Sequence, residues 1–187
     1  MENLSDEQLV AAYRKGNEQA FDLLVHRHLK PLYGFVYQFL RNPHDTEDVV
    51  QESFLKAWKQ LRSFDASKKF KTWLFQIAKN TSFDYCKKKK TIAFSDMDGD
   101  AEESFLDTIA DYAPLPDQVF ESAHLAEHLE KGLEELPLLQ RAVLFLYYQG
   151  GLIFREIADI LDEPLDTVKS RHRRALQTLR IVLDAKL

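Results

Sequence analysis

The chain has 187 residues, of which 45% are hydrophobic and 29% are charged, and this composition is ordinary for a globular protein with a real core. It contains no apolar run of the ~18 residues that a membrane-spanning helix needs, so we expect no membrane insertion. Its single cysteine, Cys86, excludes an intramolecular disulfide and agrees with the reducing cytoplasm, where we expect the protein to work.

The net charge of -5 is distributed unevenly along the chain. Residues 1–90 carry 16 Lys and Arg against 11 Asp and Glu, whereas residues 91–124 carry 9 Asp and Glu and no Lys or Arg. The acidity therefore belongs mainly to the middle of the chain, and basic patches remain on both sides of it.

Helical patterns run through the first 90 residues. A first helix begins after Ser5, whose spacing from Gln8 predicts a capping box, and it ends at Gly16. A long apolar helix follows, and Pro31 is expected to kink it.

The next helix should begin at Asn42, with Pro43 in the first helical position. Its apolar residues recur at helical spacing and predict one stripe that faces a core: Val50, Phe54, Trp58 and Leu61. A short loop then leads into a last helix over residues 70–90, which ends in four lysines.

Between about residues 91 and 123 the helical pattern fails. Acidic residues, Gly99 and two prolines predict a flexible linker there. Helical patterns resume beyond it, and no alternating strand of useful length occurs. The sequence therefore predicts an all-α protein with two small domains, residues 1–90 and 124–187, joined by an acidic linker over residues 91–123.

The stretch "GLIFREIADILDEPLDTVKSRHRRALQTLR" fits a helix-turn-helix. Ala158 is small enough for two helices to cross closely, and Pro164 is placed to start the second helix. The residues of the second helix that we expect to pack inward are Leu165, Val168, Ala175, Leu176 and Leu179. The outward residues form a candidate surface for the major groove of DNA: Thr167, Lys169, Ser170, Arg171, Arg173 and Arg174. A basic helix face that only meets solvent is the alternative.

A second basic stretch, "KTWLFQIAKNTSFDYCKKKK", mixes lysines with aromatic side chains. Cations that hold phosphates, with aromatic rings and amides beside them, suit single-stranded or melted nucleic acid. Most of these aromatic residues are nevertheless expected in the core, and the lysines at the helix end also complement the helix dipole.

Taken together, four strings resemble the extracytoplasmic-function (ECF) class of bacterial sigma factors, the alternative subunits that direct RNA polymerase to promoters. They are "AFDLLVHRH", "DTEDVVQESFLKAWKQLRSF", "FKTWLFQIAKNTSFDY" and "REIADILDEPLDTVKSRHRRAL", in the family's order and over nearly the whole chain. The resemblance implies sigma domain 2 in the N-terminal part and sigma domain 4 in the C-terminal part.

The resemblance also implies roles for matching residues. Contacts to the beta-prime clamp helices of core polymerase are expected from Asp48, Gln51, Glu52, Phe54 and Trp58. Recognition and melting of the minus-10 element are expected from Phe64, Lys69, Thr72, Trp73, Gln76, Lys79 and Asn80. The outward face of the helix-turn-helix would read the minus-35 element as duplex. The further partners implied are the beta flap of the polymerase and an anti-sigma factor, and no cofactor is expected.

The chain departs from the family pattern in the turn of the helix-turn-helix. Family members often carry Gly where this chain has Asp162, and Asp is one of the few other residues that tolerate a left-handed backbone. Asp166 favours the start of the second helix but would repel a nearby phosphate.

Two other functions stay open from the sequence. "HLAEH", from His124 to His128, matches the H-x-x-E-H pattern of zinc proteases, although no further ligand is evident. We expect no catalysis and no metal. A repressor that uses only the helix-turn-helix is the second alternative, and it would bind promoter duplex tightly without polymerase.

Overall fold

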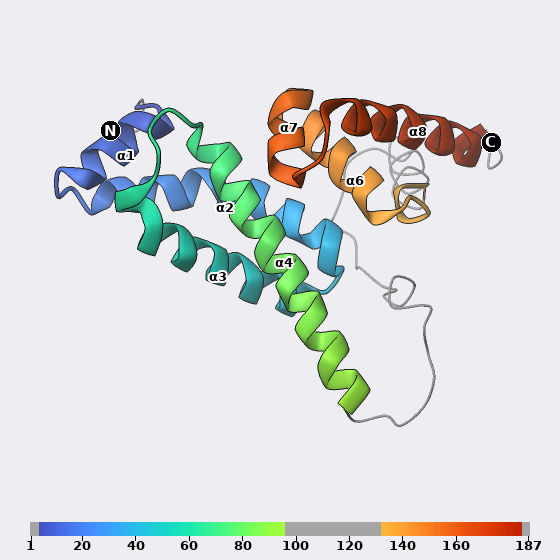
Figure 1. Cartoon of the computed structure of the whole chain (residues 1–187), viewed down its shortest axis with the longest axis horizontal. Helices are drawn as coiled ribbons and strands as arrows, with labels where there is room; N and C mark the ends of the chain where they lie inside the picture. The colour runs from blue at the N-terminus through green and yellow to red at the C-terminus, as the bar shows by residue number, and fades with distance from the viewer. Residues whose placement is uncertain (1–3, 96–131, 185–187) are drawn as a thin grey trace, which may run out of the picture.

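The computed structural model describes residues 4–95 and 132–184, and all regular elements in these two ranges are helical (Figure 1). The all-α prediction is therefore confirmed. The first range forms α1 (Asp6–Arg14), α2 (Gln19–Leu40), α3 (Pro43–Gln60), the 3-10 turn η1 (Leu61–Ser63) and α4 (Phe70–Ser95). The second forms α6 (Leu138–Leu144), the π-helical turn η2 (Phe145–Gln149), α7 (Phe154–Leu161) and α8 (Leu165–Asp184).

The predicted helix starts are present. The Ser5 hydroxyl accepts from the backbone N–H of Gln8 at 3.3 Å, and the Gln8 side chain accepts from the N–H of Ser5 at 2.8 Å. The Asn42 side chain accepts from the N–H of Asp45 at 3.0 Å, and Pro43 follows it directly. These bonds satisfy donors that a helix start otherwise leaves unpaired. α2 continues through Pro31 without ending there.

Helices α2, α3 and α4 enclose the core of the first range. Phe35, Phe70 and Phe75 are completely buried, and the rings of Phe35 and Phe75 lie 5.2 Å apart. The apolar stripe of α3 is buried as predicted at Val50, Phe54 and Leu61. The prediction was wrong for Trp58, which is 47% exposed because it lies at the edge of the stripe, beside an open groove.

Helix α1 is tied to the rest of the fold by polar contacts. Asp6 forms an ion pair with Arg27 at 2.6 Å and a hydrogen bond with the His28 ring at 2.7 Å, both on α2. Arg14 donates to the carbonyl of Leu61 at 3.4 Å and to the carbonyl of Phe64. Arg14 thus connects the end of α1 to the segment that precedes α4.

The Asp6 contacts predict a dependence of stability on acid. Burial alone would raise the pKa of Asp6, but the hydrogen bonds and charges of His28 and Arg27 outweigh it, and the pKa lies below its ordinary value of 3.8. A carboxyl with a lowered folded-state pKa stabilises the fold above its unfolded pKa, and this contribution is lost as the pH falls through the folded value. In urea unfolding, the stability advantage of the wild type over Asp6→Asn should therefore shrink between pH 5 and pH 2.5. An advantage that stays constant over this range would contradict the assignment.

The second range folds as a helix-turn-helix behind which α6 packs. Ile157 and Ile160 of α7 and Val168 and Ala175 of α8 are buried in it. Leu176 was predicted to pack inward and is instead 38% exposed, because the buried stripe of α8 passes through Val168 and Ala175 and leaves Leu176 at its margin.

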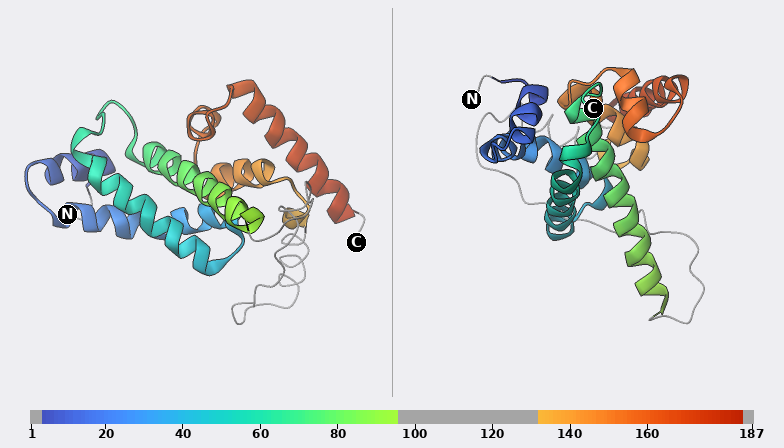
Figure 2. Two further views of the ribbon diagram at one scale, coloured as in Figure 1. Left: turned by 60° about the horizontal axis from the view of Figure 1, so that its bottom comes forward. Right: turned by 60° about the vertical axis from the view of Figure 1, so that its left-hand side comes forward.

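The two ranges pack against each other. α7 lies beside the first half of α4 and α6 packs on α2, whereas the second half of α4 extends away from the other helices (Figure 2). Buried residues of both ranges, including Phe35 and Ile157, belong to one connected apolar core. The predicted linker lies mostly outside the described residues, and α4 continues past residue 90 to Ser95.

Candidate nucleic-acid and partner interfaces

An apolar groove of about 640 Å³ lies between α2 and α3. Among its lining residues, Leu29 is 46% exposed, Leu55 50% and Trp58 47%. Three large apolar side chains that stay half exposed beside one another are typical of a surface that binds another protein.

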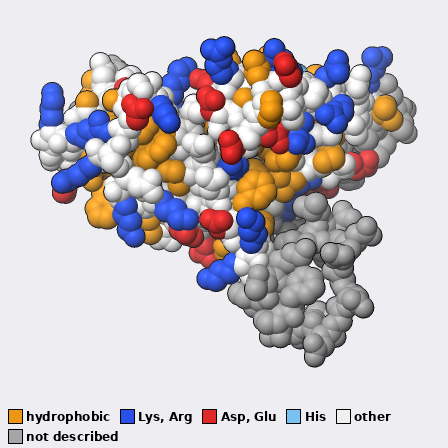
Figure 3. Space-filling view, viewed as in Figure 1, with side chains coloured by type: hydrophobic (Ala, Val, Ile, Leu, Met, Phe, Trp, Pro, Cys, Tyr) orange, Lys and Arg blue, Asp and Glu red, His pale blue; other side chains and the backbone are white. Residues whose placement is uncertain are grey.

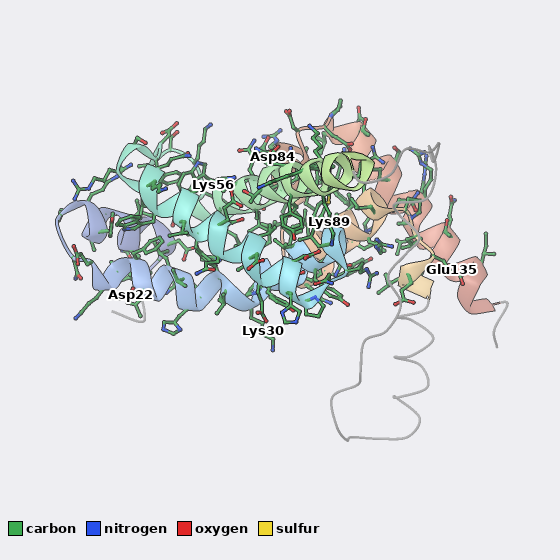
Figure 4. All side chains as sticks on the ribbon, turned by 90° about the horizontal axis from the view of Figure 1, so that it is seen from below. Asp22, Lys30, Lys56, Asp84, Lys89 and Glu135 are labelled. Atoms are coloured by element: carbon green, nitrogen blue, oxygen red, sulfur yellow. The ribbon has the colours of Figure 1, made fainter. Side chains whose placement is uncertain are left out.

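Three of the predicted polymerase-binding residues line this groove, and the other two lie outside it. Gln51, Phe54 and Trp58 line it. Asp48 is exposed on α3 outside the lining, and Glu52 forms an ion pair with Lys56 at 2.8 Å, on the helix surface shown in Figure 4. The structure therefore brings three of the five residues into one apolar surface.

The start of α4 carries most of the predicted minus-10 residues. Lys69, Thr72, Trp73 and Gln76 all line one cleft of about 800 Å³. Lys79 and Asn80 follow on α4 beyond the lining of that cleft: Asn80 is exposed, and the Lys79 ammonium lies 6.0 Å from the ring centre of Phe83.

Phe64 has a different environment from the other minus-10 candidates. It is only 5% exposed, and its ring centre lies 4.7 Å from that of Trp73 and 6.1 Å from that of Phe70. In this arrangement the Phe64 ring supports Trp73 from behind, and no base could stack on it without a local rearrangement.

Lys89, near the far end of α4, is paired with an acidic residue of α3. Asp45 accepts from the Tyr85 hydroxyl at 2.8 Å and pairs with Lys89, labelled in Figure 4, at 2.7 Å. Burial, followed by the hydrogen bond and negative charge of Asp45, raises the pKa of Tyr85 to about 12. Tyr85 therefore stays a neutral donor at physiological pH.

The turn of the helix-turn-helix has the backbone predicted for it. Asp162 adopts φ 57° and ψ 47°, the left-handed conformation that ends α7. The Glu156 carboxylate caps the start of α7 by accepting from the N–H of Ile153 at 2.9 Å.

The cationic side chains of helix α8 differ in their exposure to solvent. Lys169, Arg173 and Arg174 are exposed, and Arg174 donates to the hydroxyl of Ser170 at 3.1 Å. The hydroxyl of Ser170 in turn donates to the carbonyl of Thr167 at 2.9 Å. These residues share the outward side of the helix, as the sequence predicts for a reader of the major groove.

Arg171 differs from these cations because its guanidinium is already held. It donates to both carboxylate oxygens of Glu163, from Nε at 2.8 Å and from Nη2 at 2.6 Å. A bidentate pair of this kind is strong and fixes geometry. Sequence reasoning missed Glu163, because the two residues lie 8 positions apart across the start of a helix and match no regular helical spacing.

Within residues 4–95 and 132–184, no group of three or more His, Cys, Asp or Glu could hold a metal ion. The His124–His128 pattern lies outside those residues. Nor does either range contain a helix long and apolar enough to cross a bilayer.

Family models match both parts of the chain. The model of sigma-70 region 2 matches residues 24–92, and the model of sigma-70 region 4 matches residues 127–179. The ECF RNA polymerase sigma factor SigW of Bacillus subtilis is 34% identical over 89% of this chain and 90% of its own length. The ECF RNA polymerase sigma-E factor of Escherichia coli K12 is 35% identical over 95% of this chain and 94% of its own.

The chain belongs to the ECF sigma factors. The resemblance, the all-α fold and the function in promoter-directed transcription initiation that the sequence predicts are confirmed at the level of this family. Sigma factors are initiation factors without an enzymatic activity of their own.

Two solved structures resemble this ECF sigma factor over most of its length. CnrH in complex with the cytosolic domain of CnrY has a TM-score of 0.68 and 28% identity, and the match covers 97% of this chain and 99% of CnrH. The sigma factor RpoE in complex with the anti-sigma factor NepR, from Bartonella quintana, also has a TM-score of 0.68, with 27% identity over 88% of this chain and 96% of RpoE.

In this ECF sigma factor, regions 2 and 4 contact each other directly. Lys69 of region 2 forms an ion pair with Glu156 of region 4 at 2.6 Å. The hydrogen bond and charge of Glu156 raise the pKa of Lys69. Burial alone would raise the pKa of Glu156, but Lys69 and the N–H of Ile153 outweigh it and lower this pKa. Figure 3 shows acidic side chains lying among lysines and arginines on the face turned to the viewer.

Proposed function

We propose that this ECF sigma factor binds core RNA polymerase through the α2/α3 groove, reads the minus-10 element with the start of α4, and reads the minus-35 element with α8. The observation that carries the proposal is the pairing of two surfaces in one chain. An exposed apolar groove suits a helical protein partner, and a helix-turn-helix whose second helix presents Lys169, Arg173 and Arg174 suits duplex DNA.

The groove supports docking of the beta-prime clamp helices. Leu29, Leu55 and Trp58 give it the aromatic and aliphatic anchors that dominate protein interfaces, and Glu47 and Gln51 give it a polar rim. The beta flap would hold region 4 so that α8 faces the minus-35 element. Since RNA polymerase works in the cytoplasm, we place this protein there as well.

The minus-10 role is supported by the chemistry at the start of α4. A base extruded from the stack needs a pocket with a π-surface and polar groups, and phosphates need cations beside it. Trp73 supplies the π-surface, Thr72 and Gln76 supply the polar groups, and Lys69 supplies the cation for a phosphate.

We also propose that an anti-sigma factor regulates the protein. The solved RpoE that it resembles is bound by the anti-sigma factor NepR. The exposed apolar groove is a suitable target for such a partner. An anti-sigma factor bound there would compete with polymerase for the groove and would block the first step of initiation.

Run-off transcription tests the proposed function. Purified protein is added to core polymerase on a library of genomic promoter fragments, and start sites of the transcripts are mapped. We expect specific transcripts that share minus-10 and minus-35 elements and that are absent with core alone. No specific transcript and no association with core would overturn the proposal. Tight, specific binding of duplex DNA without polymerase would favour the repressor alternative.

A further inference from the structure

The run of four lysines on α4, residues 87–90, lies outside every surface that the proposed function uses. Lysines at the end of a helix complement the helix dipole, but this effect is confined to the last turn. α4 continues beyond Lys90 to Ser95, and its last turn contains no basic residue. The helix dipole therefore does not account for the four lysines.

The lysines lie on a part of α4 that projects from the packed helices. We call this part, residues 84–95, the α4 arm (Figures 1 and 2). Lys87, Lys88 and Lys89 are exposed on it. The arm contains four lysines against a single acidic residue, Asp84. It therefore presents a local positive charge to solvent, although the chain as a whole is acidic.

Polar contacts with α3 fix the direction of the arm. Lys56 donates to Thr81 Oγ1 at 3.1 Å. Asp45 accepts from the Tyr85 hydroxyl at 2.8 Å and pairs with Lys89 at 2.7 Å. Thr81, Tyr85 and Lys89 recur every four residues, so they lie on one side of α4, and this side is tied to α3. The exposed lysines are thus held in a defined position relative to the start of α4.

The side of α4 that faces away from α3 continues the minus-10 surface into the arm. Gln76, Lys79 and Asn80 are followed at helical spacing by Phe83 and Lys87. Phe83 is 38% exposed, and the Lys79 ammonium lies 6.0 Å from its ring centre. This stripe contains polar, aromatic and cationic side chains and no acidic one. A nucleic acid that contacts the start of α4 meets no repulsive charge on this stripe as it passes towards the arm.

The length of α4 sets how far from the minus-10 reader the lysines act. At a rise of about 1.5 Å per residue, Lys87 lies about 17 Å along the helix axis from Gln76. Successive phosphates of one DNA strand are about 3.4 Å apart, so this length corresponds to about 5 base pairs. The end of α4 leads through residues 96–131 to region 4, and the minus-35 element proposed for region 4 lies upstream of the minus-10 element. We therefore expect the arm on the upstream side.

We propose that the α4 arm binds the phosphate backbone of the promoter duplex directly upstream of the minus-10 element, with Lys87 and Lys88 as its cations. Phosphates carry no base information, so the contact adds affinity and positions the neighbouring reader without selecting a sequence. Lys89 contributes less, because Asp45 already holds its ammonium. The inference goes beyond the proposed promoter function and rests on it.

The test uses a double variant, Lys87→Gln with Lys88→Gln. Glutamine forms helices about as well as lysine, so α4 should persist, and thermal melts check this. The control is Lys15→Gln with Lys30→Gln, which also removes two exposed lysines. Neither of these residues lines the groove or the cleft, and Lys30 is labelled on α2 in Figure 4. Both double variants should bind core polymerase as the wild type does. A loss of core affinity confined to the arm variant would show that the arm binds polymerase, and would overturn the proposal.

The first measurement is the binding of holoenzyme to a promoter duplex at increasing salt. Each lost phosphate contact should reduce the slope of log K against log salt by about 0.9. The arm variant should bind more weakly than the wild type at low salt, and this deficit should shrink roughly tenfold between about 50 and 200 mM salt. The deficit should be the same for different spacer sequences, and the control should match the wild type. Equal slopes on a promoter that the wild type transcribes would overturn the role of the arm and leave the proposed function intact.

The second measurement locates the contact on the DNA. Promoter duplexes carry neutral methylphosphonate linkages over about 5 base pairs, either directly upstream or directly downstream of the minus-10 element. Upstream neutral linkages should abolish the difference between the wild type and the arm variant, because the contact is then already lost. Downstream neutral linkages should leave the difference unchanged, and the reverse pattern would overturn the proposal. Failure of wild-type run-off transcription would overturn the proposed function and the inference with it.

Discussion

Replacing Trp58 with Ala is expected to weaken binding to core RNA polymerase by roughly 30-fold or more. Trp58 is 47% exposed and lines the α2/α3 groove beside Leu55, so its ring is available to a partner. Aromatic anchors of this kind, once buried at an interface, typically contribute about 2 kcal/mol or more. The measurement is a fluorescence titration of labelled protein with core polymerase.

The control for this experiment is Phe83→Ala. Phe83 is also a partly exposed aromatic residue, at 38%, but it lies on α4 outside the groove. We expect its affinity for polymerase to stay within about twofold of the wild type, and thermal melts of both variants to show that the folds persist. Equal losses in the two variants would contradict the assignment of the groove.

Replacing Arg174 with Ala is expected to reduce minus-35-dependent transcription far more selectively than replacing Arg171. Arg174 is exposed on the outward side of α8, and a bidentate contact from Arg to a base contributes about 1–3 kcal/mol, or roughly 5- to 150-fold. The loss should come with relaxed preference at one position of the minus-35 element. Transcription from a set of single-base promoter variants measures both effects.

Arg171 is expected to behave differently because Nε and Nη2 of its guanidinium both donate to the carboxylate of Glu163. We expect Arg171→Ala and Glu163→Gln to reduce transcription by similar factors on all promoter variants, and the double variant to lose little more than either one, since the two residues act as a unit. Loss of preference at one base in Arg171→Ala but not in Glu163→Gln would show that Arg171 reads that base itself.

Local chemistry could be predicted well from the sequence. The Ser5–Gln8 capping box, the Asn42 cap and the left-handed Asp162 each depend on a few neighbouring residues, and all three are present. The apolar stripe of α3 was also correct except for Trp58. A stripe defines which side of a helix faces inward, but it does not define where the neighbouring helix stops covering it.

The features that the sequence did not predict join residues far apart in the chain. Lys69 and Glu156 are joined only by the packing of region 4 on region 2, and Phe145 approaches Gly34 for the same reason. No periodicity or spacing carries information about such a contact. Phe64 is a related case, because membership of an aromatic and basic stretch does not show whether its ring is exposed or, as here, buried beside Trp73.

The side chain of Arg14 has a consequence for where the first folding unit begins. The sigma-70 region 2 model starts at residue 24, whereas Arg14 binds the carbonyls of Leu61 and Phe64 and Asp6 binds Arg27 and His28. Helix α1 therefore restrains the loop that delivers the start of α4. An N-terminal fragment cut at the edge of the recognised region would lose this restraint, so we expect the unit that unfolds cooperatively to begin near Ser5.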